Sequence, residues 1–263
     1  MKLNFLTFGD RGAARLWRAA IIIALFSLWE IAGRYHFLDN DILPPLSRIF
    51  DMMLRLINDR HFRYDAWITL NECLITFAIV VPVGLVTGFI LGENQRLHRH
   101  LGPIFQLAMT TPKSIFLPVF ILLFGIGIVE KIIFASVLTY FIIVPTGIAA
   151  VQSLSPSLLM MARSFGATKT DIYLRLYIPA CLPLIISAIR LGLIFSMHGI
   201  IFAEMYASSE GIGRSILAWG ESFDMVRLFA AVALVMIITI SLNETLTWLE
   251  HISRRQRSGV FAA

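Results

Sequence analysis

The stretch Ser155–Pro183, SPSLLMMARSFGATKTDIYLRLYIPACLP, separates two long apolar runs and has the pattern of an ordered connection. Ser155 followed by Pro156 favours the start of a helix, because serine caps free backbone N–H groups and proline fits the first turn. Gly166 tolerates the left-handed backbone with which many helices end. The first half of the stretch therefore predicts a helix that runs through Phe165 and stops at a glycine turn.

The second half of the stretch predicts another helix directly after the glycine. Thr168 and Asp171 have the Thr-x-x-Asp spacing of a capping box, in which each residue satisfies a backbone N–H group of the other. Pro179 and Pro183 are expected to end or bend this helix where the next apolar run begins. We call residues 155–180, with their helix–glycine–helix pattern, the elbow.

The elbow carries large apolar side chains, although a connecting segment should meet water: Leu158, Leu159, Met160, Met161 and Phe165. An exposed apolar patch of this kind indicates a protein partner. The patch would instead be buried if the elbow folded back on the membrane helices of its own chain. Composition alone leaves both interpretations open.

The elbow resembles the last large cytoplasmic loop of ABC importer permeases. In that family a Glu-Ala-Ala triplet is followed after three residues by glycine and, nine residues later, by Ile-x-Leu-Pro. Gly166 matches the glycine, and residues 176–179, LYIP, are a conservative version of the second half. Met160, Met161 and Ala162 stand where Glu-Ala-Ala is expected, so this chain lacks the acidic residue of the motif.

The composition of the chain is that of an integral membrane protein. Of its 263 residues, 57% are hydrophobic and only 15% are charged, against about a quarter charged in soluble domains. Several apolar runs approach or exceed the roughly 20 residues that cross a bilayer core of about 30 Å. The runs are continuously apolar rather than alternating, which predicts an all-α membrane protein and not a barrel.

Six membrane spans are expected: Leu16–Arg34, Ala66–Leu91, Pro103–Phe124, Val129–Val151, Leu182–Tyr206 and Leu228–Leu249. The first keeps Glu30 and lacks a small-residue cleavage site, so it is interpreted as a retained span and not a signal peptide. Pro112 and Pro118 are expected to break the third. The cysteines, Cys73 and Cys181, are interpreted as small core residues without a disulfide.

Two further patterns concern packing. Gly84, Gly88 and Gly92 recur every four residues in the second span, which lets another helix approach closely. Between the first two spans, Ile49, Met52, Met53, Leu56 and Ile57 have helical spacing with charges on the other face. That pattern is typical of a helix lying in the membrane interface on the external side.

Six spans place both termini on one side, and the basic residues indicate which side. The termini and the even-numbered connections carry twelve Lys and Arg residues, against eight on the opposite face. Those eight include Lys131, and Glu130 is one of nine acids on that face. Orientation follows the basic residues, so the termini and the elbow are expected to be cytoplasmic.

Two more stretches resemble permeases for nitrate, sulfonates, taurine and related small solutes. They are Thr111–Gly127, TPKSIFLPVFILLFGIG, and Ala203–Ile216, AEMYASSEGIGRSI, with its Ala-Glu, aromatic and Gly-x-Gly pattern. The resemblance covers residues 66–250 in order. It implies a single permease domain over residues 1–263 in a bacterial inner membrane.

The family implies partners as well as a fold. Two copies, or two related chains, would form a path between them in the lipid bilayer, and an extracytoplasmic binding protein would deliver the solute. The elbow would dock on a separate ATPase subunit that holds ATP and Mg, through Leu158, Leu159, Met160, Met161, Ala162, Ser164, Phe165, Gly166, Ala167 and Pro179. No nucleic-acid partner is expected.

The sequence offers no catalytic chemistry of its own. It has no phosphate-binding loop, since Lys169-Thr170 follows threonine and not glycine. His98 and His100 lack Cys, Asp or Glu at metal-ligand spacing, and no metal or other bound cofactor is expected. This chain is therefore expected to be a non-catalytic subunit.

Lys113 is the leading candidate for contact with the solute. It lies inside the third span beside Thr110, Thr111 and Ser114, and ionisable residues in spans are functional by default. Its cation would attract an anionic solute. Alternatively, its stem reaches the interface, or it pairs with an acid such as Glu72.

Glu204, at the external end of the fifth span, is a second candidate for the path. A gate or a structural hydrogen-bond acceptor is favoured there over direct contact with the solute. Two other functions stay open for the whole chain: a membrane-embedded enzyme acting on lipid-linked substrates, and an ion-coupled carrier that works alone. The absence of a clear acidic or histidine cluster, and of an internal repeat, makes both less attractive.

Overall fold

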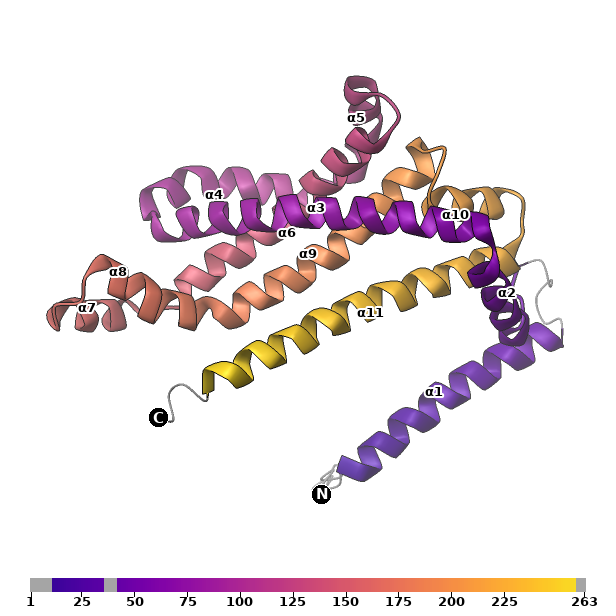
Figure 1. The fold of residues 1–263 in the computed structure, drawn as a ribbon, viewed down its shortest axis with the longest axis horizontal. Coiled ribbons are helices and arrows are strands. Elements are labelled where there is room, and N and C mark those ends of the chain that lie inside the picture. Colours follow the sequence, from indigo (N-terminus) through magenta and orange to yellow (C-terminus); the bar gives the residue numbers. More distant parts are fainter. Residues whose placement is uncertain (1–10, 36–41, 259–263) are drawn as a thin grey trace, which may run out of the picture. The chain divides into compact units, whose positions relative to one another are not determined.

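A computed structural model describes residues 11–35 and 42–258, which are helical without any strand (Figure 1). The helices are α1 (Arg11–Arg34), α2 (Leu46–Asn58), α3 (Arg60–Glu93), α4 (Gln95–Thr110), the short 3-10 helix η1 (Lys113–Phe116), α5 (Leu117–Phe124), α6 (Ile128–Gln152), α7 (Pro156–Ser164), α8 (Lys169–Asp171), a π-helical segment (Ile172–Tyr177), α9 (Ile178–Ala207), α10 (Ile212–Glu221) and α11 (Met225–Ser258). The predicted all-α class is confirmed. The N-terminal head with Lys2 lies outside the described residues.

Five of these helices are long and apolar enough to cross a membrane, and a sixth span exists if the bent pair α4 and η1–α5 counts as one. The two halves of that pair meet at 83°. Pro112 stands at the break and supplies no backbone N–H, as expected from the sequence. The expected start at Pro103 is wrong: α4 begins at Gln95, because the side chain of Asn94 caps it by accepting a hydrogen bond from Leu97 N at 3.1 Å.

The chain forms two compact units. One contains the described residues up to Arg60 together with Ile216–Leu234, and the other contains His61–Ser215 together with the described residues from Val235 onward. In the first unit, α2 buries Ile49 and Leu56, so the predicted amphipathic helix is present.

The second unit is built on α3, α6 and α9. A Cβ atom added to Gly88 of α3 would lie 2.6 Å from the carbonyl oxygen of Val144 and 2.8 Å from Cα of Gly147, both in α6. Cβ on Gly199 of α9 would likewise lie 2.8 Å from Cα of Ala135. The predicted glycine ridge of the second span therefore packs against another helix, at backbone-to-backbone distance.

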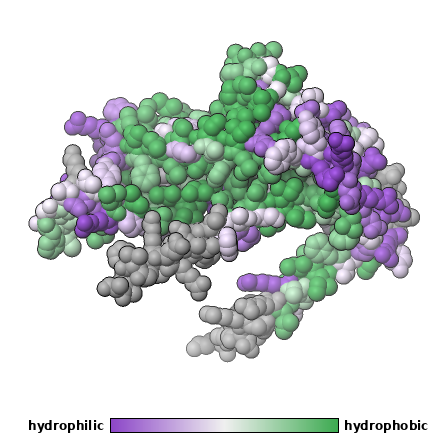
Figure 2. All heavy atoms as spheres, in the orientation of Figure 1, coloured by the Kyte–Doolittle hydropathy of each residue, from purple (hydrophilic) through white to green (hydrophobic). Residues whose placement is uncertain are grey.

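Apolar residues fill the spaces between these three helices. Both cysteines are free and fully buried, as expected: Cys73 packs with residues of α6 and α9, and Cys181 donates through its sulfur to the carbonyl oxygen of Ala150 at 3.0 Å. In Figure 2, hydrophobic side chains cover α5 and the middle of the long helices of this unit, while hydrophilic ones gather at the end where α7 and α8 lie.

The second helix of the elbow does not end at Pro179 and Pro183, which were expected to end or bend it. It continues from α8 through the π-helical segment into α9, and the resulting apolar helix spans Ile172–Ala207 instead of Leu182–Tyr206. Pro179 lies in the first turn of α9, directly after the π-helical turns. We attribute the π-helical segment to this proline, because a wider turn accommodates both its ring and its missing N–H.

Candidate functional site

The first half of the elbow is an ordered helix and turn. The Ser155 side chain caps α7 by accepting a hydrogen bond from Leu158 N at 3.4 Å. Gly166 has a φ of +78°, in the left-handed region, and Ala167 N donates back to the carbonyl oxygen of Ala162 at 3.1 Å. The predicted helix, cap and glycine turn are all present.

The capping box after the glycine is also present. Thr168 N donates to Asp171 Oδ2, and Asp171 N donates to Thr168 Oγ1, both at 3.2 Å. The Thr168 hydroxyl also donates to Asp171 Oδ2. This hydroxyl bond first, then the bond from Thr168 N, and then the nearby Arg175 guanidinium lower the pKa of the Asp171 carboxyl. A lowered pKa in the folded state means that the box stabilises the elbow at neutral pH and loses that effect as pH falls toward the carboxyl pKa.

Replacing Thr168 by alanine should loosen the start of this second helix. Loss of an N-cap hydroxyl costs about 1 kcal/mol, which corresponds to roughly fivefold faster local opening. Hydrogen exchange of the amides in residues 168–172 measures this, with Thr170→Ala, which removes an exposed neighbouring hydroxyl, as the control. Equal exchange in the two variants would contradict the role of the box.

The elbow has a packed face and an exposed face. Leu159, Ala162 and Ala167 pack against a buried cluster that includes Leu154 and Tyr177. The opposite face presents four large apolar side chains to solvent, with exposed fractions of 46% for Leu158, 68% for Met160, 56% for Met161 and 86% for Phe165. Folding back on the chain thus covers only part of the patch. Ser164, Gly166 and Pro179 are exposed as well.

A contact that the sequence did not reveal holds the elbow to α3. The hydroxyl of Tyr173, in the π-helical segment, donates to Glu93 at the end of α3. The Tyr173 ring also stacks on Tyr177, with centroids 5.4 Å apart. The elbow is therefore fixed to the end of the three-helix core and not carried on a loose loop.

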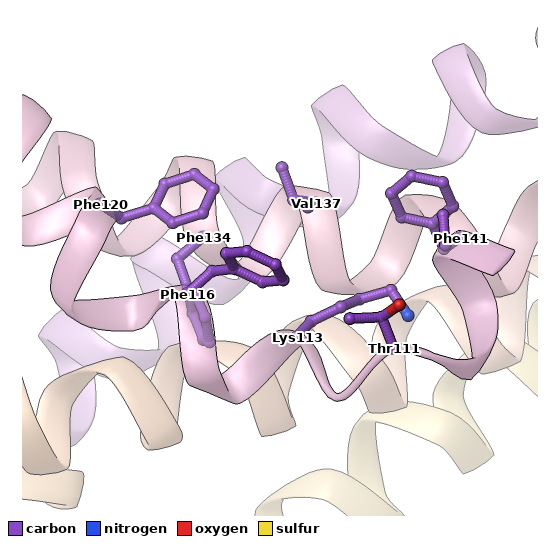
Figure 3. Close-up of a pocket in the computed structure, with 8 residues that line it drawn as sticks. Thr111, Lys113, Phe116, Phe120, Phe134, Val137 and Phe141 are labelled. Atoms are coloured by element: carbon purple, nitrogen blue, oxygen red, sulfur yellow. The ribbon is translucent and has the colours of Figure 1, made fainter. Parts of the chain in front are cut away.

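Lys113 lies at the break of the bent pair and lines a pocket of about 320 Å³ together with Thr111 and several phenylalanines (Figure 3). Its ammonium donates to the carbonyl oxygen of Met109 at 3.3 Å and lies 5.2 Å from the ring centroid of Phe141. Of the predicted path residues, the structure brings Thr111 and Lys113 together in this pocket. Thr110 and Ser114 are exposed neighbours that do not line it.

Glu204 lies apart from that pocket, fully buried near the end of α9. Its carboxylate accepts from Thr69 Oγ1 at 2.8 Å and from Gly213 N at 2.8 Å. A Cβ atom on Gly211, whose φ is +105°, would come within 2.2 Å of the same carboxylate. The Gly-x-Gly turn thus lets the backbone wrap around Glu204, in the acceptor role that the sequence analysis favoured.

Asp65 completes this buried network, and the sequence analysis missed it. Its carboxylate accepts from Gly211 N at 3.1 Å and from Ser215 Oγ at 3.1 Å. The start of α3 is thereby fastened to the turn between α9 and α10. We infer a structural role for the network, since these hydrogen bonds all run between groups of the protein itself.

A buried ion pair is a second feature that the sequence analysis missed. Lys131 Nζ lies 2.5 Å from Glu72 Oε1 and 3.2 Å from Ser208 Oγ, and both charged side chains are about 3% exposed. Glu72 therefore pairs with Lys131 and not with Lys113. The neighbouring Glu130 is also fully buried, and both residues lie at the start of α6, as the expected span from Val129 to Val151 implies.

These features define an all-helical membrane protein with an ordered, partly exposed elbow between its spans. The chain belongs to the family described as "Binding-protein-dependent transport system inner membrane component", which matches residues 81–258. The predicted resemblance to ABC importer permeases is thus confirmed. Members of this family are permease components of transporters and not enzymes.

Individual relatives agree with the family. The chain is 23% identical over 228 residues to the taurine transport system permease protein TauC of Escherichia coli (strain K12), covering 84% of this chain and 82% of that protein. It is 25% identical over 219 residues to the putative aliphatic sulfonates transport permease protein SsuC of Bacillus subtilis (strain 168), covering 83% and 78%. The formylaminopyrimidine transport permease protein ThiX of Halalkalibacterium halodurans is 24% identical over 218 residues, with 83% and 86% covered.

The fold also matches a solved structure. A chain of the MetNI methionine ABC transporter, crystallised in an inward-facing conformation, superimposes with a TM-score of 0.59 at 20% identity. The match covers 73% of this chain and 94% of the other. At this identity the likeness concerns the fold alone, and it supports the helical architecture described above.

Proposed function

We propose that this chain is the transmembrane subunit of an ATP-driven importer for a small anion. Two copies, or this chain and a related one, form the translocation path, and ATP hydrolysis on a separate subunit drives transport. An extracytoplasmic binding protein delivers the anion. The names of two relatives, a taurine and an aliphatic sulfonates permease, support a small cargo that carries an anionic group such as a sulfonate.

The exposed apolar face of the elbow is the observation that carries this proposal. The elbow is ordered by its caps and by the contact of Tyr173 with α3, yet Met160, Met161 and Phe165 stay exposed to solvent. Large apolar side chains exposed together on an ordered segment indicate a binding partner. A groove on an ATPase subunit would bury them. The distribution of basic residues supports a cytoplasmic position for the elbow, where ATP is available.

Closure of the ATPase subunits on ATP would move two elbows together and switch the path between its two openings. In physical terms this is a rigid-body transition biased by a ligand that binds one state better. The membership of the family favours this function over a lipid-acting enzyme or a stand-alone carrier.

The proposal is tested by co-purification of an ATPase subunit with the tagged chain from its native membrane. We expect Phe165→Asp to reduce the recovered ATPase roughly tenfold or more, because a charge would replace a central apolar contact. Ser157→Asp, which adds the same charge to an exposed polar position of α7, is the control and should retain the subunit. Recovery of the same amount of ATPase with Phe165→Asp would refute docking through this face.

A further inference from the structure

The pocket at Lys113 has two chemically different ends. Figure 3 shows the Lys113 side chain running along the pocket toward Thr111 and Phe141, while Phe116, Phe120 and Phe134 gather at the other end. The volume of about 320 Å³ is that of a small-ligand site, and such sites combine an apolar lining with few polar groups.

The cation in this pocket has no counter-charge. Among the residues that the structure describes, no carboxylate lies within ion-pair distance of Lys113, and Glu72 is already held by Lys131. The ammonium has one carbonyl acceptor and the face of Phe141. A charge within a membrane-spanning segment is costly without a partner, so an anion that enters the pocket gains the full interaction.

The backbone around the pocket indicates that it is not filled by lipid tails. The helix is interrupted between Thr110 and Lys113, and Pro112 contributes no N–H to bridge the gap. Irregular backbone at membrane depth occurs where it is buried in protein or lines a water-filled cavity. The break therefore belongs to a protein or water interface.

We propose that this pocket binds the cargo and selects an organic anion with an apolar body. The acidic group lies against Lys113 and Thr111, and the body lies among Phe116, Phe120 and Phe134. Aromatic faces carry negative partial charge, so a bare inorganic anion gains nothing from the ring-lined end, whereas a hydrocarbon or aromatic body does. This inference rests on the proposed import function, because it names the class of anion that is carried.

Three small probes separate the two ends of the pocket: benzenesulfonate, methanesulfonate, which lacks the ring, and benzenesulfonamide, which lacks the charge. Their binding to the full chain in phosphatidylcholine nanodiscs is measured by equilibrium dialysis. We expect benzenesulfonate to bind saturably and each of the other two to bind roughly tenfold or more weakly, since each loses one end of the pocket.

Two variants assign this binding to residues. Lys113→Met should weaken benzenesulfonate roughly 10- to 100-fold and leave benzenesulfonamide unchanged, because only the charge-assisted contact is lost. Phe116→Ala, which removes a half-exposed ring, should weaken benzenesulfonate but not methanesulfonate. Arg99→Met removes an exposed cation of α4 that does not line the pocket and should change nothing.

Several outcomes would overturn the inference. They are equal affinity for benzenesulfonate and methanesulfonate, unchanged binding in Lys113→Met, and loss of binding when phosphatidylglycerol replaces phosphatidylcholine, which would make the pocket a lipid site. If the ATPase subunit co-purifies with the chain but benzenesulfonate does not bind, this inference is refuted and the importer role is not. If benzenesulfonate binds but no ATPase subunit co-purifies with the chain, the importer role is refuted and this inference is not.

Discussion

Replacing Glu72 by alanine is expected to destabilise the protein by about 3–5 kcal/mol, because the change leaves Lys131 buried without its counter-charge. The loss should be measurable as a shift in the unfolding of the purified chain when sodium dodecyl sulfate is titrated into mild detergent. Glu210→Ala is the control, since it removes an exposed acid close to the same end of the core. That variant should unfold as the wild type does.

The double variant Glu72→Leu with Lys131→Met should recover most of the stability. Two apolar side chains of similar size need no ion pair, and such replacements are often neutral or stabilising. If the double variant were as unstable as Glu72→Ala, the loss of stability could not be assigned to the unpaired charge of Lys131. Equal stability of Glu72→Ala and wild type would show that Lys131 finds another acceptor, and Ser208 is the nearest one.

Replacing Gly88 by alanine is expected to disrupt the packing of α3 on α6, although it adds only one methyl group. The new Cβ would lie 2.6 Å from a carbonyl oxygen and 2.8 Å from a Cα atom of α6, and backbone atoms cannot turn aside as side chains can. We expect a loss of about 2–3 kcal/mol, together with a separation of α3 from α6.

The same substitution at Gly102 gives a matched control. Cβ at Gly102 would meet only the ring of His98, at 3.6 Å, which is an ordinary contact. Because alanine favours a helix over glycine by about 1 kcal/mol, Gly102→Ala should be neutral or slightly stabilising. Detergent unfolding of the two variants side by side measures the difference, and similar behaviour of both would contradict close packing of α3 on α6.

Local rules were enough to predict the elbow from the sequence. The cap at Ser155, the turn at Gly166 and the box at Thr168 and Asp171 each depend on neighbours within a few residues. The same holds for Gly88, where a repeat of four residues marks the packing face. At Pro179 the local rule left two outcomes, an end or a bend, and a π-helical segment lets the helix continue there instead of ending.

Contacts between distant residues could not be predicted in this way. Glu72 and Lys131 meet because α3 and α6 pack in one register, and no local pattern in either helix indicates its partner. Lys131 directly follows an acid, Glu130, at the expected start of the fourth span, so its charge did not indicate a partner in another helix. The aromatic lining of the pocket depends in the same way on how the broken span lies against α6.

The uninterrupted helix that follows the elbow has a mechanical consequence. A loop between the elbow and the membrane would absorb a displacement, but the 36 residues Ile172–Ala207 form one continuous helix. Near its far end, this helix is held to α3 by the hydrogen bond from Thr69 to Glu204. A displacement of the elbow would therefore be passed along α9 to its contact with α3.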